Sequence, residues 1–63
     1  MKLTGQLDKK GKGIMVGSTC FYDDVDIELI IIEEDGVFYA KPIERGFDKE
    51  ELSTVAKYLR ILE

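Results

Sequence analysis

The sequence predicts an α+β fold, in which an antiparallel four-stranded β-meander of two hairpins is followed by one C-terminal amphipathic α-helix. Three observations predict this arrangement. An Asp-Gly pair, Asp35-Gly36, separates two apolar runs and is typical of a two-residue hairpin turn. A polar, glycine-bearing turn over residues 8–13 separates two shorter runs. A helix-capping pattern that begins at Asp48 precedes apolar residues at helical spacing.

The length and the cysteine count limit how this fold is stabilised. A chain of 63 residues forms one small domain over 1–63, with hairpins over 2–19 and 25–43 and a helix over 48–62. Such a domain buries only about 60% of the surface that its unfolded chain exposes. One cysteine, Cys20, forms no internal disulfide, and a chain without histidine offers too few ligands for structural zinc. We therefore expect a homo-oligomer, a dimer or higher, with no cofactor and no metal.

The first hairpin is read from short alternating runs. Leu3 and Leu7 share a face in residues 2–7, with Gly5 between them. The return strand is expected over residues 14–19, where Ile14 and Val16 share a face.

The second hairpin carries the stronger signal, because a two-residue turn determines the pairing register. Glu34 is expected opposite Val37, and the pairing continues back to Ile30 opposite Lys41. One face is nearly all apolar and forms the predicted core: Ile27, Leu29, Ile31, Phe38 and Ala40. The other face is too apolar for contact with water alone, and its apolar residues are a candidate oligomer interface: Ile30, Ile32, Val37 and Tyr39. The alternative is that the N-terminal hairpin covers this face.

The helix is predicted from its start. Asp48 is the expected N-cap, Glu51 lies at the third helical position, and Phe47 is expected to pack on Leu52. An apolar stripe is expected to cover the sheet: Leu52, Val55, Ala56 and Leu59. Leu62-Glu63 also matches what a common C-terminal tag junction leaves behind, so these residues are either native or a remnant.

The charge is unevenly distributed along this acidic chain. Residues 1–19 carry a net +3, whereas residues 20–63 carry five basic and twelve acidic groups, a net −7. The loop lysines, Lys9, Lys10 and Lys12, are a candidate nucleic-acid contact. A solvated hairpin tip is the favoured interpretation, because the loop contains no aromatic residue to stack on bases. Nucleic acid is therefore not the expected partner.

Two further groups of residues are candidates for catalysis or for metal binding. Cys20 lacks a histidine that would lower its thiol pKa, so ordinary core packing is favoured over nucleophilic catalysis. The carboxylates before the second hairpin, Asp23, Asp24, Asp26 and Glu28, have oxygen ligands suited to Ca²⁺ or Mg²⁺. Their spacing is not that of a calcium-binding loop, and a solvated entrance to an isoleucine-rich strand is favoured. We expect no enzyme and no catalytic residues.

The opening residues 1–5 and 8–14 resemble those of the AbrB-type swapped-hairpin DNA-binding regulators. That resemblance ends at Val16-Gly17-Ser18-Thr19, where the family continues with an Ile-Pro step and a short helix. The size, the acidic β-rich body with Asp35-Gly36 and the capped segment from Asp48 resemble the small YonK-like proteins of Bacillus prophage. This second resemblance implies a phage-encoded protein in the host cytoplasm, with no catalytic residues.

The sequence therefore predicts a small non-enzymatic, homo-oligomeric accessory or regulatory protein that acts by binding another, unidentified protein. The alternative is an AbrB-like DNA-binding regulator in which an oligomer presents several copies of the Lys9–Lys12 loop. No apolar run reaches the length of a membrane span, and a lone cysteine is typical of the reducing cytoplasm. No membrane partner is expected.

Overall fold

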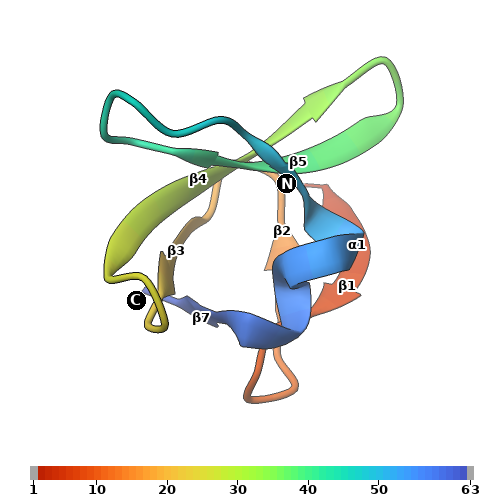
Figure 1. Cartoon of the computed structure of the whole chain (residues 1–63). Coiled ribbons are helices and arrows are strands. Elements are labelled where there is room, and N and C mark those ends of the chain that lie inside the picture. Colours follow the sequence, from red (N-terminus) through yellow and green to blue (C-terminus); the bar gives the residue numbers. More distant parts are fainter. Residues whose placement is uncertain (1, 63) are drawn as a thin grey trace.

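In the computed structural model, which describes residues 2–62, two β-sheets curve around one apolar core (Figure 1). A two-stranded sheet pairs β1 (Leu3–Leu7) with β2 (Gly13–Met15). A five-stranded antiparallel sheet has the order β6-β5-β4-β3-β7 and contains β3 (Thr19–Tyr22), β4 (Ile27–Glu34), β5 (Val37–Pro42), β6 (Glu50–Glu51) and β7 (Leu59–Ile61). The helix α1 (Leu52–Val55) and the 3₁₀ turn η1 (Ala56–Tyr58) join β6 to β7.

The α+β class is confirmed, since antiparallel sheet predominates and one short α-helix is present in the described chain. The predicted four-strand meander with a long terminal helix is wrong in detail. The described residues form seven strands in two sheets. The prediction of a tag remnant falls partly on Glu63, which lies outside the described residues.

The β4–β5 hairpin has the predicted register. Glu34 pairs with Val37, and the ladder continues through Ile30 opposite Lys41. Asp35 and Gly36 have positive φ angles of 50° and 79°, as the predicted turn requires. The strands are slightly shorter than the expected 25–43, because residues 23–26 form a turn before β4.

The core forms where the sequence placed it. The predicted sheet face is buried, with Phe38 packed at its margin, and the predicted stripe from Leu52 to Leu59 is buried against it. Two residues from other elements complete the core, Ile14 of β2 and Cys20 of β3, both fully buried. The N-terminal hairpin therefore contributes to the core through β2, which the sequence did not indicate.

The β1–β2 hairpin contains a bulge. Leu3 pairs with Met15 and Leu7 with Gly13, so β1 carries extra residues between these pairs. Thr4 fills the bulge: its buried hydroxyl donates to the Ile14 carbonyl at 2.8 Å and accepts the Gln6 N–H at 3.1 Å. As a result Thr4 faces inward, and Leu3 and Leu7 are exposed.

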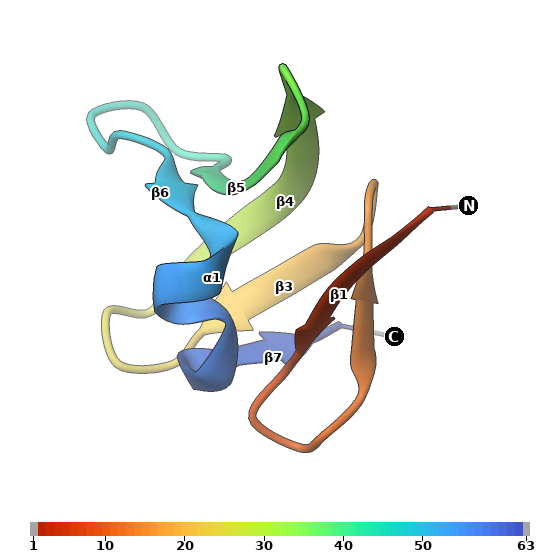
Figure 2. The same ribbon diagram turned by 90° about the vertical axis from the view of Figure 1, so that its right-hand side faces the viewer.

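The predicted return strand over 14–19 is wrong beyond Met15. The chain turns at Gly17, whose φ is 90°, and Thr19 begins the new strand β3. Ile31 bonds to both sides of this turn, since its N–H donates to the Ser18 carbonyl and its carbonyl accepts the Gly17 N–H. The turn therefore directs the chain onto the edge of β4 (Figure 2).

The helix expected over 48–62 is the largest error. Residues 47–49 have no regular structure, and Glu50 and Glu51 of β6 pair with Ala40 and Tyr39 of β5. No side chain caps α1, and Phe47 is 53% exposed rather than packed as a staple. Pairing with the edge of β5 satisfies backbone groups that a helix would otherwise satisfy internally, so tertiary context overrides the local capping pattern.

The helical segment ends at Tyr58, before the predicted end at residue 62, and β7 follows it. After η1 the chain extends, and Ile61 pairs with Cys20 while Leu59 pairs with Tyr22. Leu59 stays fully buried, as the helical reading also required. The edge of β3 thus gains a hydrogen-bonded neighbour that a helix would not supply.

Because Asp48 caps no helix, Asp48→Ala should change the free energy of unfolding by less than about 0.5 kcal/mol. Replacing a true N-cap residue by alanine would lower the free energy of unfolding by about 1 kcal/mol. Urea denaturation checks this difference. Thr4→Val is the positive control, with an expected loss of about 1–3 kcal/mol, because it leaves the buried Ile14 carbonyl and the partly buried Gln6 N–H without their partner. A loss of 1 kcal/mol or more for Asp48→Ala would mean that a helix begins there in solution.

Candidate functional site

A buried carboxylate holds the basic loop in place. Asp8 is 5% exposed, and its Oδ1 accepts the N–H groups of Lys10 at 2.9 Å and Lys12 at 2.8 Å. Its Oδ2 accepts the Ile61 N–H of β7 at 3.2 Å. Asp8 therefore organises the loop and attaches it to the last strand.

The ionised form of Asp8 is stabilised by these contacts. Burial on its own raises the pKa of Asp8, but the N–H groups of Lys12, Ile61 and Lys10 and the charge of Lys12 lower it further than burial raises it. The net effect is a pKa below the ordinary value. Asp8 therefore carries a negative charge at neutral pH.

The three predicted nucleic-acid contacts lie on this loop, but they are not equivalent. The Lys9 ammonium forms an ion pair with Asp23. Asp23 also accepts from Arg60, at 3.1 Å to Nη2 and 3.3 Å to Nε. The hydrogen bond from Arg60, followed by that from Lys9, lowers the pKa of Asp23 to about 2.

The structure adds one cation to this surface. Lys10 and Lys12 line a polar hollow of about 260 Å³ together with Arg60, which the sequence reading had placed in a helix. Asp8 also lines the hollow. The basic surface thus comes from two chain segments, and carboxylates partly neutralise it.

The candidate oligomer residues share the outer face of the β4–β5 hairpin, as predicted from the register. Ile30 is 36% exposed, and its three companions Ile32, Val37 and Tyr39 are partly exposed. The Lys49 ammonium lies 4.5 Å from the centre of the Tyr39 ring and also pairs with Glu34. The N-terminal hairpin does not enclose this face, because its Ile14 packs into the core on the opposite one.

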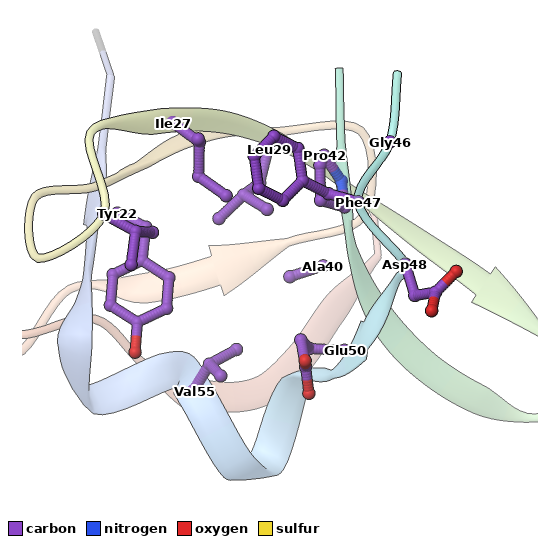
Figure 3. Close-up of a pocket in the computed structure, with 11 residues that line it drawn as sticks. Tyr22, Ile27, Leu29, Ala40, Pro42, Gly46, Phe47, Asp48, Glu50 and Val55 are labelled. Carbon is purple, nitrogen blue, oxygen red and sulfur yellow. The ribbon is translucent and has the colours of Figure 1, made fainter. Parts of the chain in front are cut away.

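An apolar groove of about 420 Å³ opens beside the core, and the sequence analysis did not predict it (Figure 3). Its apolar surface comes from the inner side of the β4–β5 hairpin and from α1: Ile27, Leu29, Ala40, Pro42 and Val55. Tyr22 lines one end, and its ring stacks on Tyr58 at 6.2 Å between centroids. The segment that follows β5 forms the opposite side, so the groove lies between three separate parts of the chain.

The rim of the groove combines exposed apolar residues with carboxylates. Val25 is 54% exposed and Phe47 is 53% exposed, although both line the groove. Figure 3 shows the Phe47 ring beside Leu29 and Pro42, and the Asp48 carboxylate directed away from the apolar lining. Asp48 and Glu50 are the charged lining residues.

Cys20 belongs to the core, as the sequence indicated. Burial, followed by the nearby charge of Asp8, raises the pKa of the Cys20 thiol to about 11, so it is protonated at neutral pH. Of the four acidic residues weighed as metal ligands, Asp23 is directed to Lys9 and Arg60 instead. Within residues 2–62, no three histidine, cysteine, aspartate or glutamate side chains are placed to hold a metal ion.

Among the described residues, no helix is long and apolar enough to cross a membrane. Comparisons with protein-family models, with curated proteins and with solved structures found no match for the chain.

The local sequence of two missed strands is compatible with a strand, although it does not distinguish a strand from a helix. Leu59-Arg60-Ile61 alternates apolar and polar residues, and Thr19 to Tyr22 is rich in β-branched and aromatic residues, so each run also fits a strand. A strand over Leu59–Ile61 places Arg60 on the sheet instead of on a helix. No local signal marks Asp8, because its partner Ile61 lies 53 residues away in the chain.

Asp8→Asn should lower the free energy of unfolding by about 1–3 kcal/mol, because the amide nitrogen cannot accept the Ile61 N–H. Urea denaturation at pH 7 checks this loss, and Asp24→Asn in the neighbouring exposed turn is the matched control. The folded-state pKa of Asp8 is lowered, so its stabilising effect is present above the ordinary Asp value of 3.8 and disappears as the pH falls through the folded pKa. The variant should therefore lose less stability than the wild type on acidification below pH 4. Equal losses in both proteins would contradict this role.

Proposed function

We propose that the chain is a small non-enzymatic accessory or regulatory protein that assembles as a homo-oligomer and acts by binding another protein. The main support for a homo-oligomer is the outer face of the β4–β5 hairpin. Four of its side chains remain partly exposed: Ile30, Ile32, Val37 and Tyr39. Apolar side chains gathered on one sheet face favour association over exposure to water.

Two features of the fold support association. The outer edge of β5 is paired with β6 only at Tyr39 and Ala40, so within residues 2–62 Val37 and Phe38 have no strand partner on that side. Exposed strand edges favour pairing with a further chain. Burial of outer-face side chains against a second copy would gain about 25 cal/mol per Å² of apolar surface, which matters for a domain of 63 residues.

We also propose a cytoplasmic setting, which rests on the single cysteine and on the charged composition of the chain. A phage or prophage origin is what the resemblance to the YonK-like proteins implies, and it stays a prediction.

The assembly predicts a sedimentation mass that is a multiple of 7.2 kDa at micromolar concentration. Ile30→Lys combined with Ile32→Lys should produce the monomer or an unfolded chain, because charges would be buried at the interface. Leu7→Lys, at a 57% exposed apolar residue of β1, is the matched control and should keep the wild-type mass. A folded wild-type protein of 7.2 kDa would rule out the oligomer.

A DNA-binding regulator is the second candidate, favoured by one observation. Arg60 joins Lys10 and Lys12 around the polar hollow, and an oligomer would present several such surfaces. The net −7 of residues 20–63 opposes this candidate, as does the ion pair that engages Lys9.

We therefore expect no sub-micromolar binding of random-sequence duplex DNA near physiological salt, as measured by a gel-shift assay. Phosphate contacts require free cations, and the acidic body repels the duplex. The DNA-binding candidate would replace the first one if the duplex bound below micromolar concentration, if the affinity fell steeply with salt, and if a triple alanine variant at Lys9, Lys10 and Lys12 lost it.

A further inference from the structure

We infer that the outer face of the β4–β5 hairpin binds the same face of a second copy across a two-fold axis, with Lys41 of each copy paired to Glu28 of the other. This inference rests on the oligomer of the proposed function, and it adds the charged residues that determine how the two faces meet. Such an interface requires a face whose charges complement those of an identical face.

Lys41 and Glu28 both border Ile30 on the outer face. Burial alternates along β4, and Glu28 and Ile30 fall on the exposed side. Lys41 of β5 pairs directly opposite Ile30 and is also exposed. Ile30, at 36% exposure, is the most exposed of the four apolar residues on this face. One cation and one carboxylate therefore flank the most exposed apolar side chain of the face.

Neither charge has a partner within its own copy. The other carboxylate on the outer face of the hairpin, Glu34, pairs with Lys49. Within residues 2–62, no side-chain hydrogen bond or ion pair engages Lys41 or Glu28. Covering Ile30 with another protein surface would also bury Lys41 beside it, and a buried charge without a partner is costly. The occupant of this face must therefore offer a carboxylate to Lys41 and a cation to Glu28.

A second copy of the chain meets both requirements. A two-fold interface brings the same residues together twice, because every contact is repeated with the two copies exchanged. One contact between Lys41 and Glu28 of different copies therefore implies a second, and all four charges are paired. Ile30 lies opposite Lys41 and two residues from Glu28, so this arrangement also brings the two Ile30 side chains together.

The balance of charge on the face favours a second copy over a different protein. The outer face of the hairpin, with Lys49 above it, carries carboxylates and cations in equal number: Glu28, Glu34, Lys41 and Lys49. A uniformly acidic or basic partner surface would place a like charge next to Glu28 or Lys41. Two copies of net charge −4 repel each other at long range, so their association depends on local contacts such as these. An identical face offers the balanced charges that the site requires.

The test measures the dissociation constant of the pair by sedimentation equilibrium of the full chain near physiological salt. Lys41→Glu and Glu28→Lys should each weaken self-association at least about 4-fold, because two exposed ion pairs become two repulsive pairs. Lys41→Glu changes the net charge of a copy from −4 to −6, and Glu28→Lys changes it from −4 to −2. Weaker association of the less charged Glu28→Lys copies separates a specific contact from general repulsion, which predicts the opposite.

Mixing the two variants gives the decisive measurement. In an equimolar mixture, the glutamate introduced at position 41 of one copy meets the lysine introduced at position 28 of the other, and the unchanged Lys41 and Glu28 also meet. The mixture should therefore associate with about the wild-type affinity, although neither variant does so alone. The matched control mixes Lys41→Glu with Asp24→Lys, a change in the exposed turn before β4, so that the net charges are again −6 and −2. This control should not recover the wild-type affinity, because one of its two contacts stays repulsive.

Urea denaturation confirms that each variant is folded, and Lys41→Gln and Glu28→Gln replace a charge reversal that does not fold. These neutral variants should weaken self-association at least about 2-fold, through loss of both ion pairs. Unchanged association of the folded variants, no recovery in the first mixture, or equal recovery in both mixtures would overturn the inference and leave the oligomer standing. A folded wild-type protein of 7.2 kDa would overturn the oligomer and the inference together.

Discussion

The closed shape of this small protein depends on the buried carboxylate of Asp8. The two sheets do not share a strand ladder, and the N-terminal hairpin meets the last strand through its loop. There the Asp8 carboxylate accepts the Ile61 N–H, and the Lys9 N–H donates to the Leu59 carbonyl at 2.9 Å. These contacts cover the outer edge of β7, which would otherwise expose unpaired backbone groups. A charged acceptor forms stronger hydrogen bonds than a neutral one, and this compensates for its burial.

The parts of the fold that the sequence predicted are those with local causes. The turn at Asp35-Gly36 determines the register of β4 and β5, and the register in turn assigns Ile31 to the core and Ile30 to the outer face. The outer-face patch could therefore be predicted in full. The buried stripe from Leu52 to Leu59 was also correct although the helix was not, because the burial of Leu59 is compatible with a strand as well as with a helical turn.

The parts that could not be predicted depend on pairing between distant residues. β7 pairs with β3, and β3 pairs with β4. A short run such as Leu59–Ile61 contains too little periodicity to distinguish a strand from a helix. The capping pattern at Asp48 is a real local signal, but isolated helices of this length are only marginally stable in water. The edge of β5 offers residues 50 and 51 hydrogen bonds that extend the sheet, and the chain adopts them.

The same departure from the expected helix creates the groove. On a helix, residues 48 and 50 would project in different directions, since positions two apart do not share a face. In the observed structure Asp48 and Glu50 both line the groove, and Lys49 pairs with Glu34. A helix that began at Asp48 would also have packed Phe47 on Leu52, whereas the observed Phe47 is free to stand at the rim. The groove is therefore a product of tertiary pairing at the edge of β5, and any change that restored the helix would remove it together with β6.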